Sequence, residues 1–321
     1  MVSRRICATG KGMAFAYRVF EQDGHRLHEI VDRDGGYRLQ VDNLGAELVS
    51  VARHATESDW AGYLYRDGEV KPAQQGWQGH ATVMGYFLHR LKNGRTLYEG
   101  DEIRGGNHGF LRHKTFSDPE IVIAERATLS YSLPADHILA LEYPRKVSFQ
   151  IKYTLDRNMV EVTFLFHNEE MERQSHVSFG LHPGFGISSF EQARIVLPKG
   201  TYRRHLAPNN LLSGETVEFE SDGATMPIKP FDLPGSFLLE TVEADSCVVK
   251  LLDYGRNRQV EFDLSDAPYF TIWSDLNPFI CVEPCWGLPD HQEQRPFEKK
   301  LGIQTIPPQE TFSGRFSMRL D

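Results

Sequence analysis

Apolar and polar side chains alternate along much of this sequence, and that alternation limits the folds open to it. The clearest example lies between residues 146 and 155, where every second position is apolar: Val147, Phe149, Ile151, Tyr153 and Leu155. Side chains two residues apart lie on the same face of an extended chain, so the pattern is typical of strands buried on one face. The same period recurs in 37–51, 160–166, 260–264, 270–272 and 316–320. Each of these segments predicts strand structure.

Glycine and proline interrupt the alternating segments at short intervals, since the chain has 27 glycines and 17 prolines. Asp156-Arg157-Asn158 separates two alternating segments, and Asp and Asn favour tight turns. We therefore expect residues 146–166 to form an antiparallel hairpin. The segment 46–54 could begin as a helical turn after Gly45, but its valines favour a strand.

Many short strands with frequent turns predict an all-β protein, a large antiparallel β-sandwich. All-β domains commonly exceed 200 residues, so we expect one domain over residues 37–321. Residues 1–36 are expected to be an N-terminal extension that ends near Asp34-Gly35-Gly36. The sequence shows no internal repeat of fixed period and no low-complexity linker.

Charge and composition narrow the class of protein. With 35 basic and 44 acidic residues, the net charge of −9 disfavours a partner bound through its phosphates, and no nucleic-acid role is expected. No stretch approaches the roughly 20 apolar residues that span a bilayer, and the N-terminus lacks the apolar core of a secretory signal. Four cysteines do not form a disulfide scaffold. These features predict a cytoplasmic globular protein with a small-molecule or protein partner.

Three short stretches carry polar groups that an ordinary β-protein does not require. They are Asn107 to Arg112 (NHGFLR), Leu181 to Gly186 (LHPGFG) and Cys281 to Gly287 (CVEPCWG). Glycines permit close backbone approach, a proline turn holds His182 at a strand end, and Glu283 interrupts an apolar run. Structural alternatives remain open: His-Pro is a common turn opening, and Glu283 could be salt-bridged on an edge strand.

Metal and cofactor motifs are missing from the sequence. Cys281 and Cys285 are four residues apart, but no second cysteine pair or histidine pair completes a zinc set, so they are interpreted as small buried apolar residues. The sequence contains no phosphate-binding glycine loop, no dinucleotide fingerprint and no nucleophile elbow. We expect neither a metal nor an organic cofactor.

Taken in order, the three stretches resemble the aldose 1-epimerase (galactose mutarotase-like) superfamily. Further stretches resemble the family from about residue 37 to the end of the chain. They are Gly45 to Leu48, Met84 to Gly94, the central hairpin 153–162, and the terminal turn Pro307 to Glu310. The form Gly109-Phe110 followed by Arg112 is similar to the branch that contains the hexose-6-phosphate epimerases and uncharacterised mutarotase-like proteins.

The resemblance implies a site for a monosaccharide or a sugar phosphate, and a reaction that needs no cofactor. Anomers interconvert when a base removes the anomeric hydroxyl proton and an acid protonates the ring oxygen, which opens the ring. By similarity, Glu283 is the base and His182 is the acid. His108 and Arg112 then bind sugar hydroxyls, and Arg90 matches an arginine of the family.

Two departures from the family pattern concern the residues around the sugar. Gly184 stands where the family usually has an aromatic residue. The aspartate that the family uses to bind hydroxyls has no residue in clear register here, so Asp232 is the candidate and Asp275 the fallback. A phosphate would need converging basic groups, and Arg90, Arg112, His113 and Lys114 are available. The sequence leaves the sugar open, and a monomer and a homodimer are both compatible with it.

Two other functions compete with the isomerase. A non-catalytic carbohydrate-binding protein could keep the same fold, although binding alone needs no acid–base pair, and both Glu283 and His182 are retained. A lyase or hydrolase on a related sandwich would call for paired carboxylates or a Tyr/Arg arrangement, and none is evident in the sequence. We therefore expect an aldose 1-epimerase.

Overall fold

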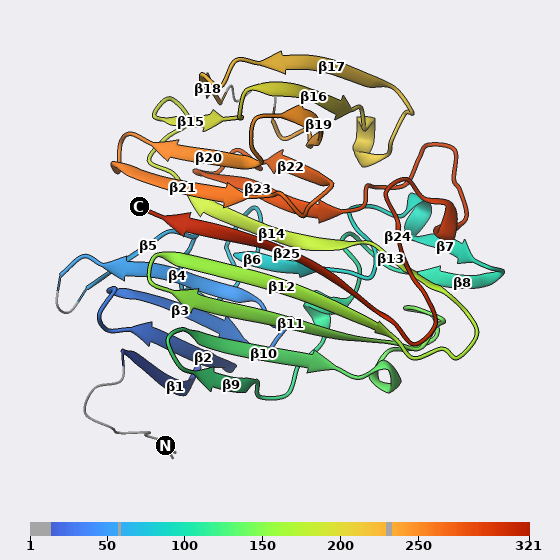
Figure 1. Cartoon of the computed structure of the whole chain (residues 1–321), viewed down its shortest axis with the longest axis horizontal. Coiled ribbons are helices and arrows are strands. Elements are labelled where there is room, and N and C mark those ends of the chain that lie inside the picture. Colours follow the sequence, from blue (N-terminus) through green and yellow to red (C-terminus); the bar gives the residue numbers. More distant parts are fainter. Residues whose placement is uncertain (1–13, 57–58, 229–232) are drawn as a thin grey trace.

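Strands make up nearly all the regular structure of the protein (Figure 1). The computed structural model describes residues 14–56, 59–228 and 233–321. Within these ranges every pairing between named strands is antiparallel, as the short alternating segments predict. The predicted all-β antiparallel sandwich is confirmed.

The largest sheet contains nine strands and includes the predicted central hairpin. Its spatial order is β18 (Thr225–Pro227), β15 (Ala193–Val196), β20 (Val248–Asp253), β21 (Arg258–Asp263), β25 (Thr311–Leu320), β12 (Met159–Asn168), β11 (Val147–Asp156), β10 (Ala127–Leu133) and β9 (Glu120–Ile123). β11 and β12 pair along their whole length, from Val147 with Asn168 to Asp156 with Met159. Arg157 turns the chain with a φ of 52°. The hairpin prediction is therefore correct.

Two further sheets complete the sandwich. The seven-stranded sheet has the order β17 (Thr216–Ser221), β16 (Gly200–His205), β19 (Phe237–Ala244), β22 (Tyr269–Trp273), β23 (Phe279–Trp286), β14 (Phe179–Gly186) and β6 (Ala81–Met84). The five-stranded sheet has the order β1 (Phe15–Gln22), β2 (His25–Asp32), β3 (Tyr37–Asp42), β4 (Leu48–His54) and β5 (Trp60–Gly62). The segment 46–54 is thus mainly strand, as its valines favour.

Short elements connect the sheets. Two small sheets pair β7 (Arg95–Tyr98) with β8 (Asp101–Arg104), and β13 (Ser175–Val177) with β24 (Gln304–Ile306). Single 3-10 turns lie at Lys92–Gly94, Leu111–His113, Ala135–His137, Pro208–Asn210 and Phe297–Lys299. No helix in the described part of the chain is long and apolar enough to span a bilayer.

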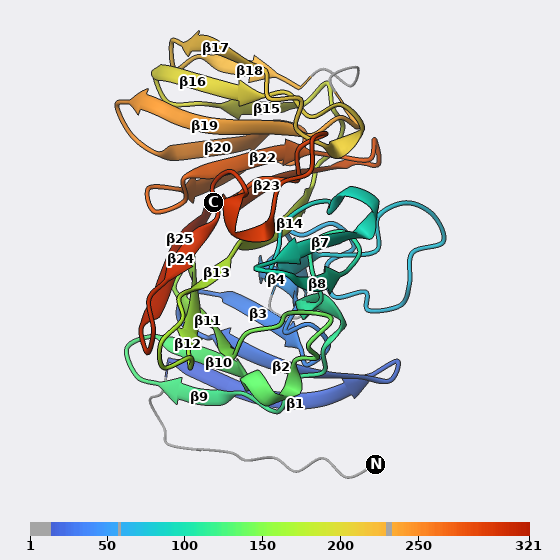
Figure 2. The same cartoon turned by 90° about the vertical axis from the view of Figure 1, so that its right-hand side faces the viewer.

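The nine-stranded sheet packs against both of the other large sheets, as the edge-on view shows (Figure 2). Its contact with the seven-stranded sheet is aromatic, since the rings of Phe166 and Phe179 lie 4.7 Å apart. Its contact with the five-stranded sheet includes the Tyr153 hydroxyl, which donates to the carbonyl oxygen of Ala46 at 2.7 Å. One hydrophobic core runs through all three sheets. The sheets are therefore held together as layers of one unit.

The expected N-terminal extension overlaps this unit. β1 and β2 form a hairpin, and β2 pairs with β3 from Leu27 with Asp42 to Asp32 with Tyr37. The expected boundary at residue 36 thus lies in the turn between two paired strands. The sequence did not mark residues 15–32 as strands, because their alternation is weaker than that of the later segments. We propose that the domain begins at β1. Residues 1–13 lie outside the described residues.

Candidate active site

Neighbouring strands of the seven-stranded sheet bring His182 and Glu283 together. β14 and β23 pair with Gly180 opposite Cys285 and Gly184 opposite Cys281, which sets position 182 opposite position 283. His182 Nε2 lies 3.3 Å from Glu283 Oε1. The two residues are 6% and 1% exposed. A histidine and a carboxylate 101 positions apart in the sequence therefore form a buried pair.

Burial controls the protonation of this pair. It raises the pKa of Glu283 well above its ordinary value. Burial also lowers the pKa of His182 to about 3, and electrostatic interactions with His89 and Arg112 lower it further. Both shifts favour the uncharged forms, because a charge loses its hydration in an apolar surrounding. The surroundings of the pair therefore favour a protonated carboxyl group beside a neutral imidazole.

Two polar atoms of the pair have no hydrogen-bond partner among the described residues. They are Glu283 Oε2 and His182 Nδ1, and both are buried. A buried polar atom without a partner costs about 1–3 kcal/mol. Such atoms are retained most readily where a ligand supplies the missing contacts.

A close contact between two glycines fixes the position of His108. Gly109 has a φ of 71°, and a Cβ atom on it would come within 1.9 Å of the carbonyl oxygen of Gly85. The His108 amide donates to the carbonyl oxygen of His89 at 2.7 Å. This arrangement sets the His108 ring edge-on to that of His182, with centroids 5.3 Å apart. Three of the predicted site residues, His108, His182 and Glu283, thus lie in one cluster.

His89 belongs to the same cluster, although the sequence analysis did not single it out. Its ring centroid lies 5.3 Å from that of His108, and its Nε2 lies 3.9 Å from Cys285 Sγ. Burial lowers the pKa of His89 to about 4, so the imidazole is neutral near pH 7. Its position next to Arg90, in a stretch that resembles the family, was the only available signal.

Aromatic rings enclose His182. Trp77 stacks on its imidazole at 4.8 Å, and Trp273 meets it edge-on at 5.3 Å. A Cβ atom on Gly184 would come within 2.4 Å of the Trp77 ring. The Trp77 indole, from a loop distant in the sequence, therefore packs against position 184, where the family usually has an aromatic residue. This replacement could not be predicted from the sequence, because Trp77 is 105 positions from His182 and lies in none of the family-like motifs.

Asp275 holds the Trp77 loop in place. Its Oδ2 accepts a hydrogen bond from the Trp77 amide at 2.7 Å, and its Oδ1 accepts one from the Asn277 amide at 2.9 Å. Both carboxylate oxygens are thus engaged by the backbone. The preferred candidate, Asp232, lies outside the described residues.

The two predicted arginines flank the cluster. Arg90 is exposed, and its Nε donates to Asn107 Oδ1 at 3.2 Å, next to His108 in the chain. Arg112 lies in the 3-10 turn 111–113 and donates through Nε to His113 Nε2 at 3.1 Å. In the described ranges neither guanidinium forms an ion pair with a carboxylate. Arg90 and Arg112 are therefore available to an anion or to hydroxyl groups.

The turn before β4 packs against the backbone of Arg112. Gly45 has a φ of 72°, and a Cβ atom on it would lie 3.0 Å from the backbone of Arg112. Two residues later, Glu47 accepts hydrogen bonds from the His80 amide at 2.8 Å and from the Thr82 hydroxyl at 2.9 Å. Thr82 is the partner of His182 in the register of β6 with β14. The early Gly-Ala-Glu-Leu stretch thus contributes to the frame of the site.

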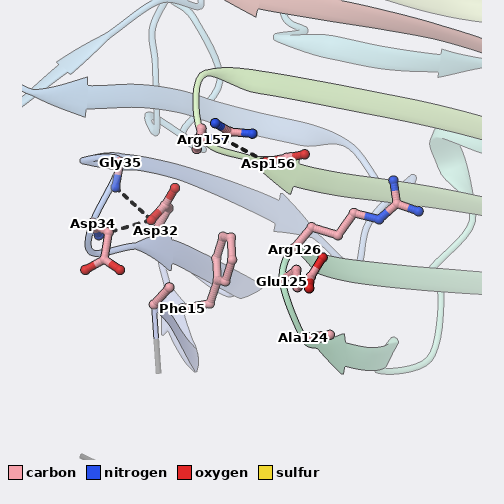
Figure 3. Close-up of a pocket in the computed structure, with 10 residues that line it drawn as sticks. Phe15, Asp32, Asp34, Gly35, Ala124, Glu125, Arg126, Asp156 and Arg157 are labelled. Atoms are coloured by element: carbon pink, nitrogen blue, oxygen red, sulfur yellow. Dashed lines mark hydrogen bonds and ion pairs between the residues drawn. The ribbon is translucent and has the colours of Figure 1, made fainter. Parts of the chain in front are cut away.

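A large surface hollow lies elsewhere and shares no residue with this cluster. It has a volume of about 920 Å³ and is lined by the turns after β2, β9 and β11. Figure 3 shows its charged side chains of both signs, among them Asp32, Arg126 and Arg157. Asp32 accepts hydrogen bonds from the amides of Asp34 and Gly35, at 3.0 and 2.8 Å, within its own turn. The Asp32 carboxylate therefore stabilises its own turn.

Two sets of side chains in the cluster have the composition of a metal site. One is His89, Glu283 and Cys285, and the other is His182, Cys281 and Glu283. Within each set the ligand atoms lie within 4.8 Å of one another, and all five residues are buried. The spacing of cysteines along the sequence could not reveal either set, because the histidines come from other segments.

The protein has antiparallel sheets packed face to face, with a histidine–glutamate pair on two neighbouring strands. These features are those of a galactose mutarotase-like β-sandwich protein. Within that class, residues 28–319 match the model of the family described as aldose 1-epimerase, and the chain belongs to this family. The predicted superfamily is therefore confirmed.

Individual relatives are distant in sequence and similar in fold. The plasmid-encoded protein LacX of Lactococcus lactis subsp. lactis is 24% identical over 285 residues, which cover 80% of this chain and 87% of LacX. A galactose mutarotase related enzyme from Lactobacillus acidophilus has a TM-score of 0.78 at 23% identity, covering 95% of this chain and 97% of that one. A galactose mutarotase-like protein from Lactobacillus casei has a TM-score of 0.76 at 20% identity, covering 95% and 100%. At these identities the solved structures establish the fold alone.

Proposed function

We propose that the protein is an aldose 1-epimerase that interconverts the α and β anomers of a monosaccharide or sugar phosphate. The observation that supports this most directly is the buried contact of 3.3 Å between His182 Nε2 and Glu283 Oε1. Removing an anomeric proton and protonating a ring oxygen requires one base and one acid near the same sugar ring. Membership of the aldose 1-epimerase family agrees with this chemistry.

One transferable proton, on Glu283 beside a neutral His182, is sufficient for the reaction. Transfer of that proton from Glu283 to His182 produces a carboxylate and an imidazolium, which are the base and the acid. Hydroxyl groups of a bound sugar would stabilise the carboxylate by donating hydrogen bonds to it. Glu283 then accepts the anomeric proton while His182 protonates the ring oxygen. The C1–O5 bond breaks, the aldehyde rotates about C1–C2, and the reverse transfers close the other face of the ring.

The surrounding residues would bind the sugar. We assign His108 and Arg112 to hydroxyl groups near the pair, and Arg90 and Asp232 to more distant ones. Arg90 and Arg112 would also suit a phosphate, because guanidinium groups bind phosphate oxygens in a bidentate manner. Trp77 and Trp273 offer aromatic faces to the C–H groups of the ring. None of these steps calls on a metal or an organic cofactor.

Exchange NMR on a panel of aldoses and aldose 6-phosphates tests the proposal. The wild type should speed anomer exchange of at least one sugar. Glu283→Gln keeps the shape of the side chain but cannot accept the proton, so the rate constant should fall by about 10²–10⁴-fold while sugar affinity changes little. Glu172→Gln makes the same chemical change at an exposed position and should leave the rate unaltered.

One outcome would remove the mechanism. If Glu283→Gln exchanges anomers at the wild-type rate, Glu283 is not the base. If the wild type binds a sugar and accelerates no exchange on the panel, the chain is a carbohydrate-binding protein on this fold.

A further inference from the structure

Three side chains of β23 point toward the same face of the sheet. Cys281, Glu283 and Cys285 are two residues apart in sequence, so their side chains share one side of the strand. All three are buried, at 0%, 1% and 0% exposure. The proposed reaction uses only the carboxylate of the three. Two thiols beside a catalytic carboxylate therefore need an explanation of their own.

We propose that His89, Glu283 and Cys285 form a binding site for a thiophilic divalent cation of the zinc class. Imidazole nitrogen, thiolate sulfur and carboxylate oxygen are the three ligand types that zinc binds in proteins. A bound cation would occupy the carboxylate that serves as base, so it would stop anomer exchange. This inhibitory effect rests on the proposed function, whereas the binding does not.

The distances within the set are close to those of a coordinated ion. Ligands at about 2.0–2.3 Å from a tetrahedral zinc ion lie roughly 3.3–3.6 Å from one another. His89 Nε2 and Cys285 Sγ are 3.9 Å apart, and all three ligand atoms lie within 4.8 Å. Side-chain rotations that bring the atoms closer together by up to about 1.5 Å would complete the site. Three protein ligands leave a fourth position for water, as in zinc sites that are not purely structural.

Unsatisfied atoms in the cluster also point to a ligand. Glu283 Oε2 is buried and has no hydrogen-bond partner in the described ranges, while Oε1 faces His182. Coordination would give this carboxylate a partner without displacing the His182 contact. Among the described residues the only hydrogen-bond partner of the His89 side chain is Cys285 Sγ at 3.9 Å, so the same two atoms can turn toward one cation.

Cys285 is the better of the two thiols. Its Sγ lies 3.9 Å from the Thr271 hydroxyl, which can orient and stabilise a thiolate from the second coordination sphere. Among the described residues Cys281 Sγ has no hydrogen-bond partner. The alternative set would also take His182, which is already paired with Glu283 at 3.3 Å and stacked against Trp77. The geometry therefore favours the set with Cys285.

Charge balance allows the ion to be buried. On binding, the S–H bond of Cys285 and the O–H bond of Glu283 break, and both protons pass to solvent. A divalent cation with one thiolate, one carboxylate and one neutral imidazole has no net charge. A neutral complex avoids the large cost of placing an isolated ion in an apolar surrounding. No oxidant or reductant is needed.

Cobalt and zinc titrations of the full-length protein, stripped of metal beforehand, test the binding. Co²⁺ should produce a thiolate-to-cobalt charge-transfer band in the near ultraviolet at one equivalent. Zn²⁺ should remove that band and should compete with a chromophoric chelator at the same stoichiometry. Cys285→Ser should abolish the band and weaken Zn²⁺ binding at least about 10–100-fold, the loss typical for an outer-sphere partner alone. Cys281→Ser is the matched control and should keep both signals.

Folding of each variant is checked by near-ultraviolet circular dichroism, and His89→Gln supplies a second ligand variant that leaves both thiols intact. Absence of a one-to-one band in the wild type would overturn the proposal. A band lost in Cys281→Ser and kept in Cys285→Ser would overturn it as well, in favour of the other set.

The inhibitory effect has its own readout. In wild type and Cys281→Ser, anomer exchange should fall in proportion to Zn²⁺ occupancy and return when EDTA is added. Cys285→Ser, compared with its own metal-free rate, should be insensitive to the same Zn²⁺ concentrations. Undiminished exchange at full occupancy would overturn the inhibition. If the wild type exchanges no sugar, the proposed function fails while the metal titrations still decide the site.

Discussion

At the scale of single residues, burial decides the protonation of the site. His182 and Glu283 would be imidazole and carboxylate with ordinary pKa values if they were exposed, near about 6.5 and 4.3. Burial shifts the two values in opposite directions, so that the pKa of His182 falls to about 3 and the pKa of Glu283 rises. Burial therefore favours the protonated carboxyl group and the neutral imidazole together.

A broad pH plateau follows from these shifts. The rate should fall only when a second proton joins the pair, near the low pKa of His182, or when the last proton leaves, above the raised pKa of Glu283. We therefore expect kcat/KM, corrected for spontaneous exchange, to stay constant from about pH 5 up to the raised pKa of Glu283. Exchange NMR over that range measures it. A tenfold loss per pH unit above about 6.5 would show an imidazolium with an ordinary pKa.

Gly109 allows a second prediction at this scale. Alanine there would combine a positive φ of 71° with a Cβ atom 1.9 Å from the Gly85 carbonyl oxygen. The left-handed backbone alone costs about 1–2 kcal/mol, and the contact would displace His108. Gly109→Ala should lower the free energy of unfolding by at least that amount. It should also slow exchange by roughly 10²-fold, a typical effect of a small misplacement.

Gly106→Ala is the control for this change. A Cβ atom on Gly106 has no neighbour within 4 Å, so stability should stay within about 0.5 kcal/mol of the wild type. Urea denaturation and exchange NMR measure both variants. Equal behaviour of the two alanine variants would show that the glycine contact does not position His108.

At the scale of elements, the strands that carry the site depend on polar anchors at their ends. Asn168 is the last residue of β12 and is fully buried. Its Nδ2 lies 3.0 Å from the carbonyl oxygens of both Ile306 and Pro307, and its Oδ1 accepts from the Ser175 hydroxyl at 2.9 Å. The anchor thus joins β12 to β13 and β24. β13 leads directly into β14, the strand of His182.

Replacing this anchor should be costly. Asn168→Leu has a similar volume and leaves several buried groups without partners, at about 1–3 kcal/mol for each. We expect a loss of roughly 3 kcal/mol or more in the free energy of unfolding, measured by urea denaturation. Ser175→Ala removes only one of the contacts and should cost about 1 kcal/mol. Equal losses in the two variants would contradict a central role for Asn168.

In the molecule as a whole, the nine-stranded sheet packs against both of the other large sheets and joins them through one core. Residues as far apart as Ile30 on β2 and Phe270 on β22 belong to one hydrophobic core. Sheets that share a core lose their packing together. We therefore expect the described strands to unfold as one cooperative unit that includes the N-terminal hairpin.

Ile30→Ala tests whether β1 and β2 belong to the domain. Ile30 is fully buried, so its truncation should lower the stability of the entire protein by about 2–5 kcal/mol in a single thermal transition. Arg33→Ala changes an exposed residue in the next turn and should have little effect. A separate early transition in Ile30→Ala, with the main transition unshifted, would instead identify an independent extension.

The class of fold and the most strongly alternating strands could be predicted from the sequence alone. Alternation is a local property, because neighbouring side chains of a strand face opposite ways. The segments 147–156 and 159–168 show it clearly. Turn residues are local too, so the hairpin between them was predictable. The residues His108, His182 and Glu283 could be selected because each stands in a short ordered motif.

Which of these residues meet, and what surrounds them, depends on how distant segments pack in three dimensions. His89, Trp77 and Cys285 join the cluster through contacts between segments far apart in the chain, and periodicity carries no information about such contacts. The weakly alternating strands β1 and β2 owe their place to pairing with β3, since tertiary packing can outweigh local pattern. The protonation of His182 and Glu283 likewise depends on burial, which arises only when the layers close around them.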